Sequence, residues 1–251
     1  MVNLGPMMAK ATWETLYMVG AAAFFTLLLG LPLGVLLVIT ARGGLWEKPG
    51  LNRVLGVLVN IGRSTPFVIL MVAVTPLTRA IVGSSIGTTA AIVPLVVAAV
   101  PFMGRVVEQA LHEVSPGLVE AALAMGSTNW QVVTKVLLAE ARPSLVRGTA
   151  LMLVNVVGYS AMAGAIGGGG LGDVAVKWGY ARYEMDVMYV SLVILVVMVQ
   201  VMQWIGDSLA KVAPEFVAIA ERADAVGEAE EEVDLSRGKE THRLRVRASR
   251  S

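Results

Sequence analysis

Five long runs of apolar residues divide the chain. They cover residues 15–40, 55–77, 86–103, 148–166 and 187–205. Each is close to the ~20 residues that a helix needs to cross a ~30 Å hydrocarbon core. The pattern predicts an all-α polytopic membrane protein with five transmembrane helices.

Proline and glycine mark three of these runs. Pro66 interrupts the second run, and Pro94 and Pro101 lie in the third. Because neighbouring helices must satisfy the carbonyls that proline frees, we expect both runs to be interior to a helix bundle. In the first run, Gly30 and Gly34 form a small-residue pair that favours close helix contact.

The basic residues predict the orientation. With the N-terminus outside, the inner segments carry Arg42, Lys48, Arg53, Arg105, Lys135, Arg142, Arg147 and Lys211. The outer segments carry only Lys10, Arg79, Lys177 and Arg182. This asymmetry favours an outer N-terminus and a cytoplasmic C-terminus. The segment 104–147 is then cytoplasmic, and the glycine-rich segment 167–186 is outside.

The last forty residues differ from the rest. We expect a transmembrane domain over residues 1–212 and a polar cytoplasmic tail over 213–251, with acids at 228–234 and bases at 237–250. Such a composition is typical of a disordered tail. Contact of its basic end with the membrane surface is the alternative.

Charge and composition exclude several kinds of chemistry. The chain is 56% hydrophobic and 16% charged, and it contains no Cys, which excludes disulfides and thiolate catalysis. The apolar cores of spans two to five carry no acidic residue, and span one has only Glu14 at its outer edge. The groups of a proton relay are therefore missing, and we expect no metal site. We interpret Arg63, at the inner end of span two, as reaching the cytoplasmic interface; a pathway role is the alternative.

The glycine run Gly167–Gly172 resembles two nucleotide-binding motifs only formally. It matches G-x-G-x-x-G, but nothing around it is typical of a strand. Asp173 stands where a P-loop requires Lys. We interpret the run as a flexible outer turn that permits tight backbone packing. Any energy for transport must then come from another subunit.

The cytoplasmic segment 113–144 predicts two short helices. Ser115 and Pro116 suit a helix start, Gly126 suits a helix stop, and Thr128 to Gln131 matches a capping box. The first helix carries an apolar stripe, and the second runs through further apolar positions: Leu118, Ala121, Ala122 and Met125, then Val132, Val133, Val136 and Leu137. Because it is larger than a simple connection, we expect this segment to dock on a partner protein.

These residues also carry a family resemblance. Glu120-Ala121-Ala122, Gly126 and Val136-Leu137-Leu138 resemble the E-A-A loop of ABC-importer permeases, although Ala139 stands where that family usually has Pro. The resemblance implies that 113–144 is the coupling loop, which seats on an ATP-binding subunit. It assigns this role to Glu120, Ala121, Ala122, Gly126, Val136 and Leu138. A solvated first-turn acid is the other interpretation of Glu120.

A second resemblance narrows the family. Arg63-Ser64-Thr65-Pro66-Phe67 and the run from Gly158 to Asp173 are similar to the permeases of methionine importers. The family-motif positions are Arg63, Ser64, Pro66, Gly168, Gly169 and Gly170. The resemblance implies a type I ABC importer permease fold and import of L- and/or D-methionine across the bacterial cytoplasmic membrane. Another small amino acid or an osmoprotectant is the alternative substrate.

The same resemblance implies an assembly. A second copy of the chain, two ATPase subunits that bind ATP and Mg, and an external substrate-binding protein would complete it, within membrane lipid and without nucleic acid. The chain itself would be no enzyme and hold no cofactor. A membrane enzyme lacks a polar catalytic cluster here, and a passive channel would need no coupling loop.

Four residues of span four are candidates for the pathway or its gate. They are Asn155, Tyr159, Ser160 and Met162. Met162 is also suited to generic packing, and the three polar residues to hydrogen bonds between helices.

Overall fold

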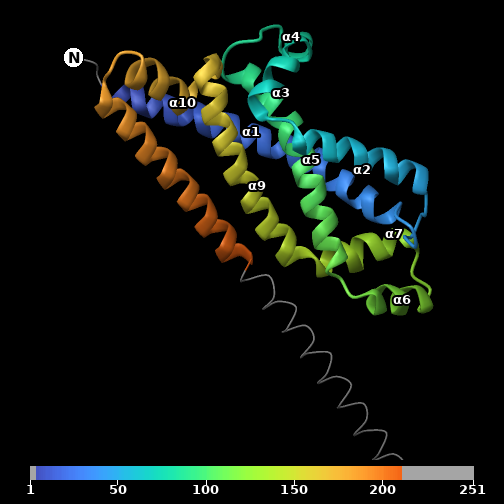
Figure 1. Ribbon diagram of the computed structural model, residues 1–251. Coiled ribbons are helices and arrows are strands. Elements are labelled where there is room, and N and C mark those ends of the chain that lie inside the picture. Colours follow the sequence, from blue (N-terminus) through green and yellow to red (C-terminus); the bar gives the residue numbers. More distant parts are fainter. Residues whose placement is uncertain (1–3, 211–251) are drawn as a thin grey trace, which may run out of the picture.

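The computed structural model describes residues 4–210, and within that range it is built of helices without strands (Figure 1). The helices up to the second connecting loop are α1 (Leu4–Ile39), α2 (Pro49–Ser64), α3 (Phe67–Ala73), α4 (Thr75–Val82), α5 (Thr88–His112), α6 (Pro116–Ala124), α7 (Asn129–Gln131), η1 (Val132–Leu137) and α8 (Leu138–Glu140). They are followed by α9 (Arg142–Ala163), η2 (Gly164–Gly168), α10 (Gly170–Val174), η3 (Ala175–Tyr180) and a last helix, Met185–Ala210. The predicted tail 213–251 lies outside the described residues.

Four helices are long and apolar enough to cross a bilayer. They are Leu4–Ile39, Thr88–His112, Arg142–Gly168 and Met185–Ala210. A fifth span is present if the pair α2 and α3 crosses as one unit, but the two helices are bent by 110°. The second predicted span is therefore not a straight helix.

The break between α2 and α3 follows from Pro66. The residue before a proline is pushed out of the helical region, and Thr65 is extended with φ −81° and ψ 124°. Proline also lacks the N–H that a continuing helix would need. The sequence locates this break, but the direction of the bend depends on what the two helices contact.

α1 and α5 pack against each other through small residues. A Cβ added at Gly30 would lie 2.7 Å from Cβ of Met103, and one at Gly34 would lie 2.6 Å from the Gly104 carbonyl oxygen. Met103 is 1% exposed, so the close approach creates a dense core. The predicted contact at the Gly30 and Gly34 pair is confirmed.

The third predicted span lies in the interior of the subunit, whereas the second lies on its surface. α5 buries twelve residues, but α2 buries only Val59 within the single chain. The expectation for the second span is wrong for the isolated subunit. Its large apolar side chains, such as Leu58 and Ile61, face outward.

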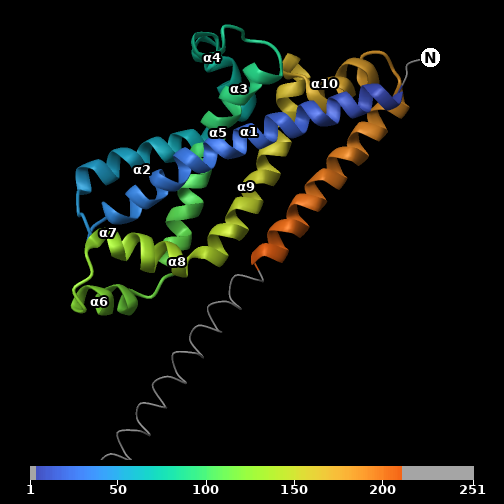
Figure 2. The ribbon, with the colours of Figure 1, turned by 180° about the vertical axis from the view of Figure 1, so that it is seen from behind.

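The two connecting regions lie at opposite ends of the molecule. In both Figure 1 and Figure 2, α6 and α7 lie beside the C-terminal end of α1, whereas α10 lies beside its N-terminal part. The connection between α5 and α9 is shorter than the predicted 104–147, because α5 continues to His112. Within this added length, Nη1 of Arg105 lies 2.7 Å from Oε2 of Glu108, one turn apart.

Candidate functional site

The coupling loop folds into two short helices joined by a tight turn. α6 begins at Pro116, directly after Ser115, and Gly126 then turns the chain with φ +86°. Oγ1 of Thr128 accepts a hydrogen bond from the Gln131 N–H (3.3 Å), and the Thr128 N–H donates to Oε1 of Gln131 (2.8 Å). The predicted helix start, stop and capping box are confirmed.

The apolar side chains of the coupling loop divide into buried and exposed groups. The buried ones are Ala122, Val132, Val133 and Leu137. Leu118 is 46% exposed and Met125 is 81% exposed. The predicted stripe of the first helix is therefore not a packing face within the chain. Exposed apolar residues of this kind suit contact with another protein.

The structure brings the predicted coupling residues together in this one loop. Glu120 and Ala121 are exposed on α6, Ala122 is buried, Gly126 forms the turn, and Val136 and Leu138 are half-buried. Glu120 lines a cavity of about 550 Å³ between α6 and the turn that follows α1. Nδ2 of Asn129 donates to the carbonyl oxygen of Leu45 (3.0 Å), so the loop is fixed to that turn.

The four pathway candidates lie on α9 but do not form one cluster. Ser160 is 1% exposed and its Oγ donates to the Val157 carbonyl (2.8 Å) within the same helix. Nδ2 of Asn155 likewise donates to the Leu151 carbonyl (3.0 Å). Met162 is 48% exposed. Of these three, Ser160 is closed off, whereas Met162 and the half-buried Asn155 are accessible to a ligand or a partner.

Tyr159 connects α9 to the break in the second apolar run. Its ring stacks on Phe67, with centroids 4.7 Å apart and planes 8° apart. Arg63 and Ser64 lie just before that break and are exposed. Arg63 lies near the C-terminal end of α2, fourteen residues after Pro49. That its side chain reaches the cytoplasmic interface stays a prediction.

The glycine turn, residues 164–172, is densely packed. Gly167, Gly169 and Gly170 have φ values of +97°, +79° and +75°, which side chains rarely adopt. A Cβ at Gly164 would lie 2.5 Å from the Asp173 nitrogen, and Gly172 lies directly against the backbone of Ala161. Tight packing is confirmed, but the expectation of a flexible turn is not.

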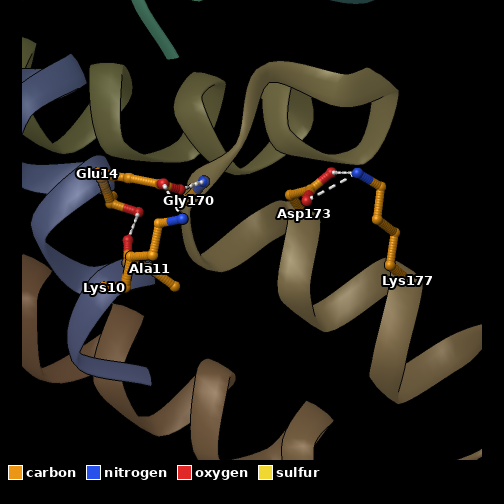
Figure 3. A network of polar contacts seen from close by, with 7 residues as sticks. Lys10, Ala11, Glu14, Gly170, Asp173 and Lys177 are labelled. Carbon is orange, nitrogen blue, oxygen red and sulfur yellow. Dashed lines mark hydrogen bonds and ion pairs between the residues drawn. The ribbon is translucent and has the colours of Figure 1, made fainter. Parts of the chain in front are cut away.

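Two side chains of α1 hold this turn. Oε2 of Glu14 accepts a hydrogen bond from the Gly170 N–H (2.9 Å), and Oγ1 of Thr15 accepts one from the Leu171 N–H (2.9 Å). Figure 3 shows the Glu14 side chain reaching from α1 to Gly170. The same carboxylate lies 3.8 Å from Nζ of Lys10. The N–H groups that begin α10 are thus satisfied by another helix.

The acid that stands in place of a P-loop lysine has an internal partner. Nζ of Lys177 lies 2.7 Å from Oδ1 and 2.9 Å from Oδ2 of Asp173, one turn later (Figure 3). The Gly170 N–H donates its hydrogen bond to Glu14. The turn therefore uses its backbone donors for packing within the chain. Among residues 4–210, no group of three His, Asp or Glu side chains is placed to hold a metal ion.

Sequence reasoning missed the role of Glu14. The available signal was an acid at the edge of a long apolar run, where few charged groups occur. That signal indicates a special position but does not identify a partner 156 residues away.

Comparison with known proteins places this geometry in context. Residues 30–212 match the model of the family described as "Binding-protein-dependent transport system inner membrane component". The "Probable D-methionine transport system permease protein MetI" of Vibrio cholerae is 54% identical over 205 residues, which cover 82% of this chain and 91% of that protein. The protein of the same name from Haemophilus influenzae is 46% identical over 203 residues, covering 81% and 95%.

Solved structures agree with the sequence relatives. A structure described as an inward-facing conformation of the MetNI methionine ABC transporter matches with a TM-score of 0.83 and 46% identity, over 85% of this chain and 99% of that chain. An amino acid ABC transporter solved with histidines matches with a TM-score of 0.65 and 18% identity, covering 84% and 94%. The second likeness supports the fold alone.

Proposed function

The chain belongs to the family of binding-protein-dependent transport system inner membrane components, and on that premise we propose that it is the permease subunit of an ATP-driven methionine importer. It is a multi-pass protein of the bacterial cytoplasmic membrane. The observation that supports methionine as the substrate is the 54% identity to the probable D-methionine permease of Vibrio cholerae. The alternative of a different small amino acid or an osmoprotectant is not favoured.

The chain is a transport subunit, and ATP is used by a partner. ATP and Mg are bound by two ATPase subunits, one for each copy of this chain in a dimer. The exposed Glu120 and the exposed apolar side chains of α6 support docking of the ATPase on the coupling loop. Because Glu120 is exposed, it is available to a partner cation.

The orientation belongs to the same proposal. The coupling loop faces the cytoplasm, and the glycine turn faces outward, where an external binding protein delivers methionine. The greater number of basic residues in the inner segments supports this orientation. The location of the two regions at opposite ends of α1 is consistent with it (Figures 1 and 2).

The transport step is a shift between two packings of the helices. ATP binding closes the ATPase subunits and moves the coupling loops together, which favours the outward-open packing. Hydrolysis restores the inward-open one. ATP can shift this equilibrium only as far as its binding affinity differs between the two states of the complex.

Uptake of radiolabelled methionine tests the substrate. We expect cells that lack this gene to lose concentrative uptake at low external concentration and to recover it on complementation. Competition by unlabelled L- and D-methionine then identifies the preferred enantiomer. Unchanged uptake in the deleted strain, with no other methionine transporter active, would contradict the assignment.

Substitution of Glu120 tests the coupling loop. We expect Glu120→Lys to fold and reach the membrane but to lower methionine transport and ATPase stimulation by more than about tenfold, because it reverses a charge at a protein interface. ATPase stimulation is measured on the purified complex, and methionine transport after its reconstitution in proteoliposomes. Glu140→Lys is the matched control, since Glu140 is an exposed acid of the same loop outside α6. Wild-type rates in Glu120→Lys would refute the role.

A further inference from the structure

Arg63 lies at a break in a helix. It is the last residue but one of α2, and α3 leaves after Pro66 at an angle of 110° to α2. Both Arg63 and its neighbour Ser64 are exposed in the chain. Broken helices at membrane depth are tolerated where they line a water-filled cavity or are covered by protein.

The neighbours of Arg63 indicate its depth. A Cβ added at Gly62 would lie 2.5 Å from Cγ of Pro101, and Pro101 is close to the middle of α5. On the other side of the break, Phe67 stacks on Tyr159 of α9. Arg63 therefore lies within the membrane-spanning part of the helix bundle, beside Pro101 of α5 and one turn before the stack of Phe67 on Tyr159.

No acidic side chain at this depth neutralises the guanidinium group. The sequence has no Asp or Glu between Glu47 and Glu108. Among residues 4–210, the ion pairs involve other residues: Lys10 with Glu14, Arg105 with Glu108, and Lys177 with Asp173. A second copy of the chain has the same sequence, so its apolar spans also lack an acid. An arginine that faces lipid at this depth is costly, which favours a watery surface for Arg63.

The chemistry of the site selects a carboxylate. A guanidinium group presents a planar fork of N–H donors that matches a carboxylate with two parallel hydrogen bonds. An amino acid in transit carries one carboxylate, and it must pass the centre of the membrane. We propose that Arg63 faces the translocation pathway and binds the carboxylate of the transported amino acid. The inference rests on the proposed function and adds the group that recognises the substrate there.

Reconstituted complexes test this role. Wild-type complex in proteoliposomes, supplied with ATP and methionine-loaded binding protein, is measured first for uptake and for ATP hydrolysis. We expect Arg63→Gln to lower the methionine imported per ATP by about tenfold, the effect of losing a charge-assisted hydrogen bond, while hydrolysis stays within about twofold. Arg63→Lys, which keeps the charge, retains an intermediate ratio. Arg53→Gln, an exposed arginine of the same helix, behaves as wild type.

A cysteine reporter tests the ligand without the binding protein. The chain has no Cys, so Ser64→Cys carries its only thiol. We expect an anionic methanethiosulfonate reagent to label this thiol, methionine to slow the labelling, and methioninamide, which lacks the carboxylate, to leave it unchanged. The protection by methionine disappears when Arg63→Gln is added. If the complex with Arg63→Gln does not assemble, the test uses Ser64→Cys with Arg63 intact. Protection by methionine but not by methioninamide then supports binding of the carboxylate.

The outcomes separate this inference from the function on which it rests. A wild-type complex that imports no methionine refutes the proposed function. A wild-type complex that imports methionine, with equal import per ATP in Arg63→Gln, refutes the role of Arg63 alone. An unlabelled Ser64→Cys, or equal protection by methionine and methioninamide, also overturns it. So does labelling that responds to anionic lipid and not to methionine, which would identify a lipid phosphate as the partner.

Discussion

Single side chains determine the conformation of the two breaks in this chain. Pro66 ends the helical path between α2 and α3, and Glu14 and Thr15 hold the glycine turn against α1. At the first break the controlling residue is local, whereas at the second it comes from 156 positions away. The stability of the turn therefore depends on residues outside it.

Removal of the Glu14 carboxylate should loosen the glycine turn. We expect Glu14→Ala to lower the free energy of unfolding by about 1–3 kcal/mol, because it leaves the Gly170 N–H without its acceptor. Thermal unfolding of the purified complex in detergent measures the change. Lys10→Ala is the control: its side chain is 79% exposed and lies 3.8 Å from the carboxylate, so it should change little. Equal midpoints for the two variants would contradict the prediction.

At the scale of the elements, hydropathy predicted which segments are helical better than where they end. α5 was expected over 86–103 and extends to His112. Its last turns carry Arg105 and Glu108, which pair on the helix surface and continue the helix beyond the apolar run. Hydropathy reports the part of a helix that contacts lipid or the core, so a polar extension gives no signal.

The short-range signals of the coupling loop were more informative than its hydrophobic pattern. The capping box at Thr128 and the stop at Gly126 depend on neighbours within a few positions, and both were predicted. The exposure of Leu118 and Met125 depends on how α6 is placed against the rest of the chain. Contacts between residues far apart in the sequence cannot be deduced from the spacing of apolar residues within one helix.

The cap at Thr128 should stabilise the second half of the coupling loop. We expect Thr128→Ala to lower local stability by about 0.5–2 kcal/mol, because the Gln131 N–H loses its acceptor. Hydrogen exchange of residues 129–137 in the purified complex should accelerate accordingly. Thr134→Ala is the control, since its hydroxyl donates only to the Trp130 carbonyl of the preceding turn. No difference in exchange between the variants would refute the cap.

For the whole molecule, the contact between α1 and α5 organises the fold. Gly30 and Gly34 allow these two long helices to approach until side chains of one touch the backbone of the other. α2 and the last helix leave much of their apolar surface exposed in the single chain. A dimer in a lipid bilayer accounts for that surface without further packing inside the subunit.

A single methyl group at Gly34 should disturb this contact. We expect Gly34→Ala to destabilise the subunit by about 1–3 kcal/mol, because the new Cβ would overlap Val107 and the Gly104 carbonyl. The yield of intact complex after detergent extraction and its thermal midpoint measure the effect. Gly20→Ala, on the same helix, meets open space and should be neutral or slightly stabilising. Equal losses for both variants would argue against a close contact at Gly34.

The continuity of α1 gives the contact at Gly30 and Gly34 a mechanical meaning. If that contact acts as a fulcrum, the arm to Glu14 is about 18 residues, or ~27 Å, and the arm to the end of the helix is about 7 residues, or ~10 Å. Pro32 lies between the two glycines and removes one backbone hydrogen bond of the helix, so α1 bends more easily here than elsewhere. A bend of ~6° at this point moves Glu14 by ~3 Å. That is enough to break its hydrogen bond of 2.9 Å to the Gly170 N–H. A small change of angle at the helix contact can therefore release the glycine turn.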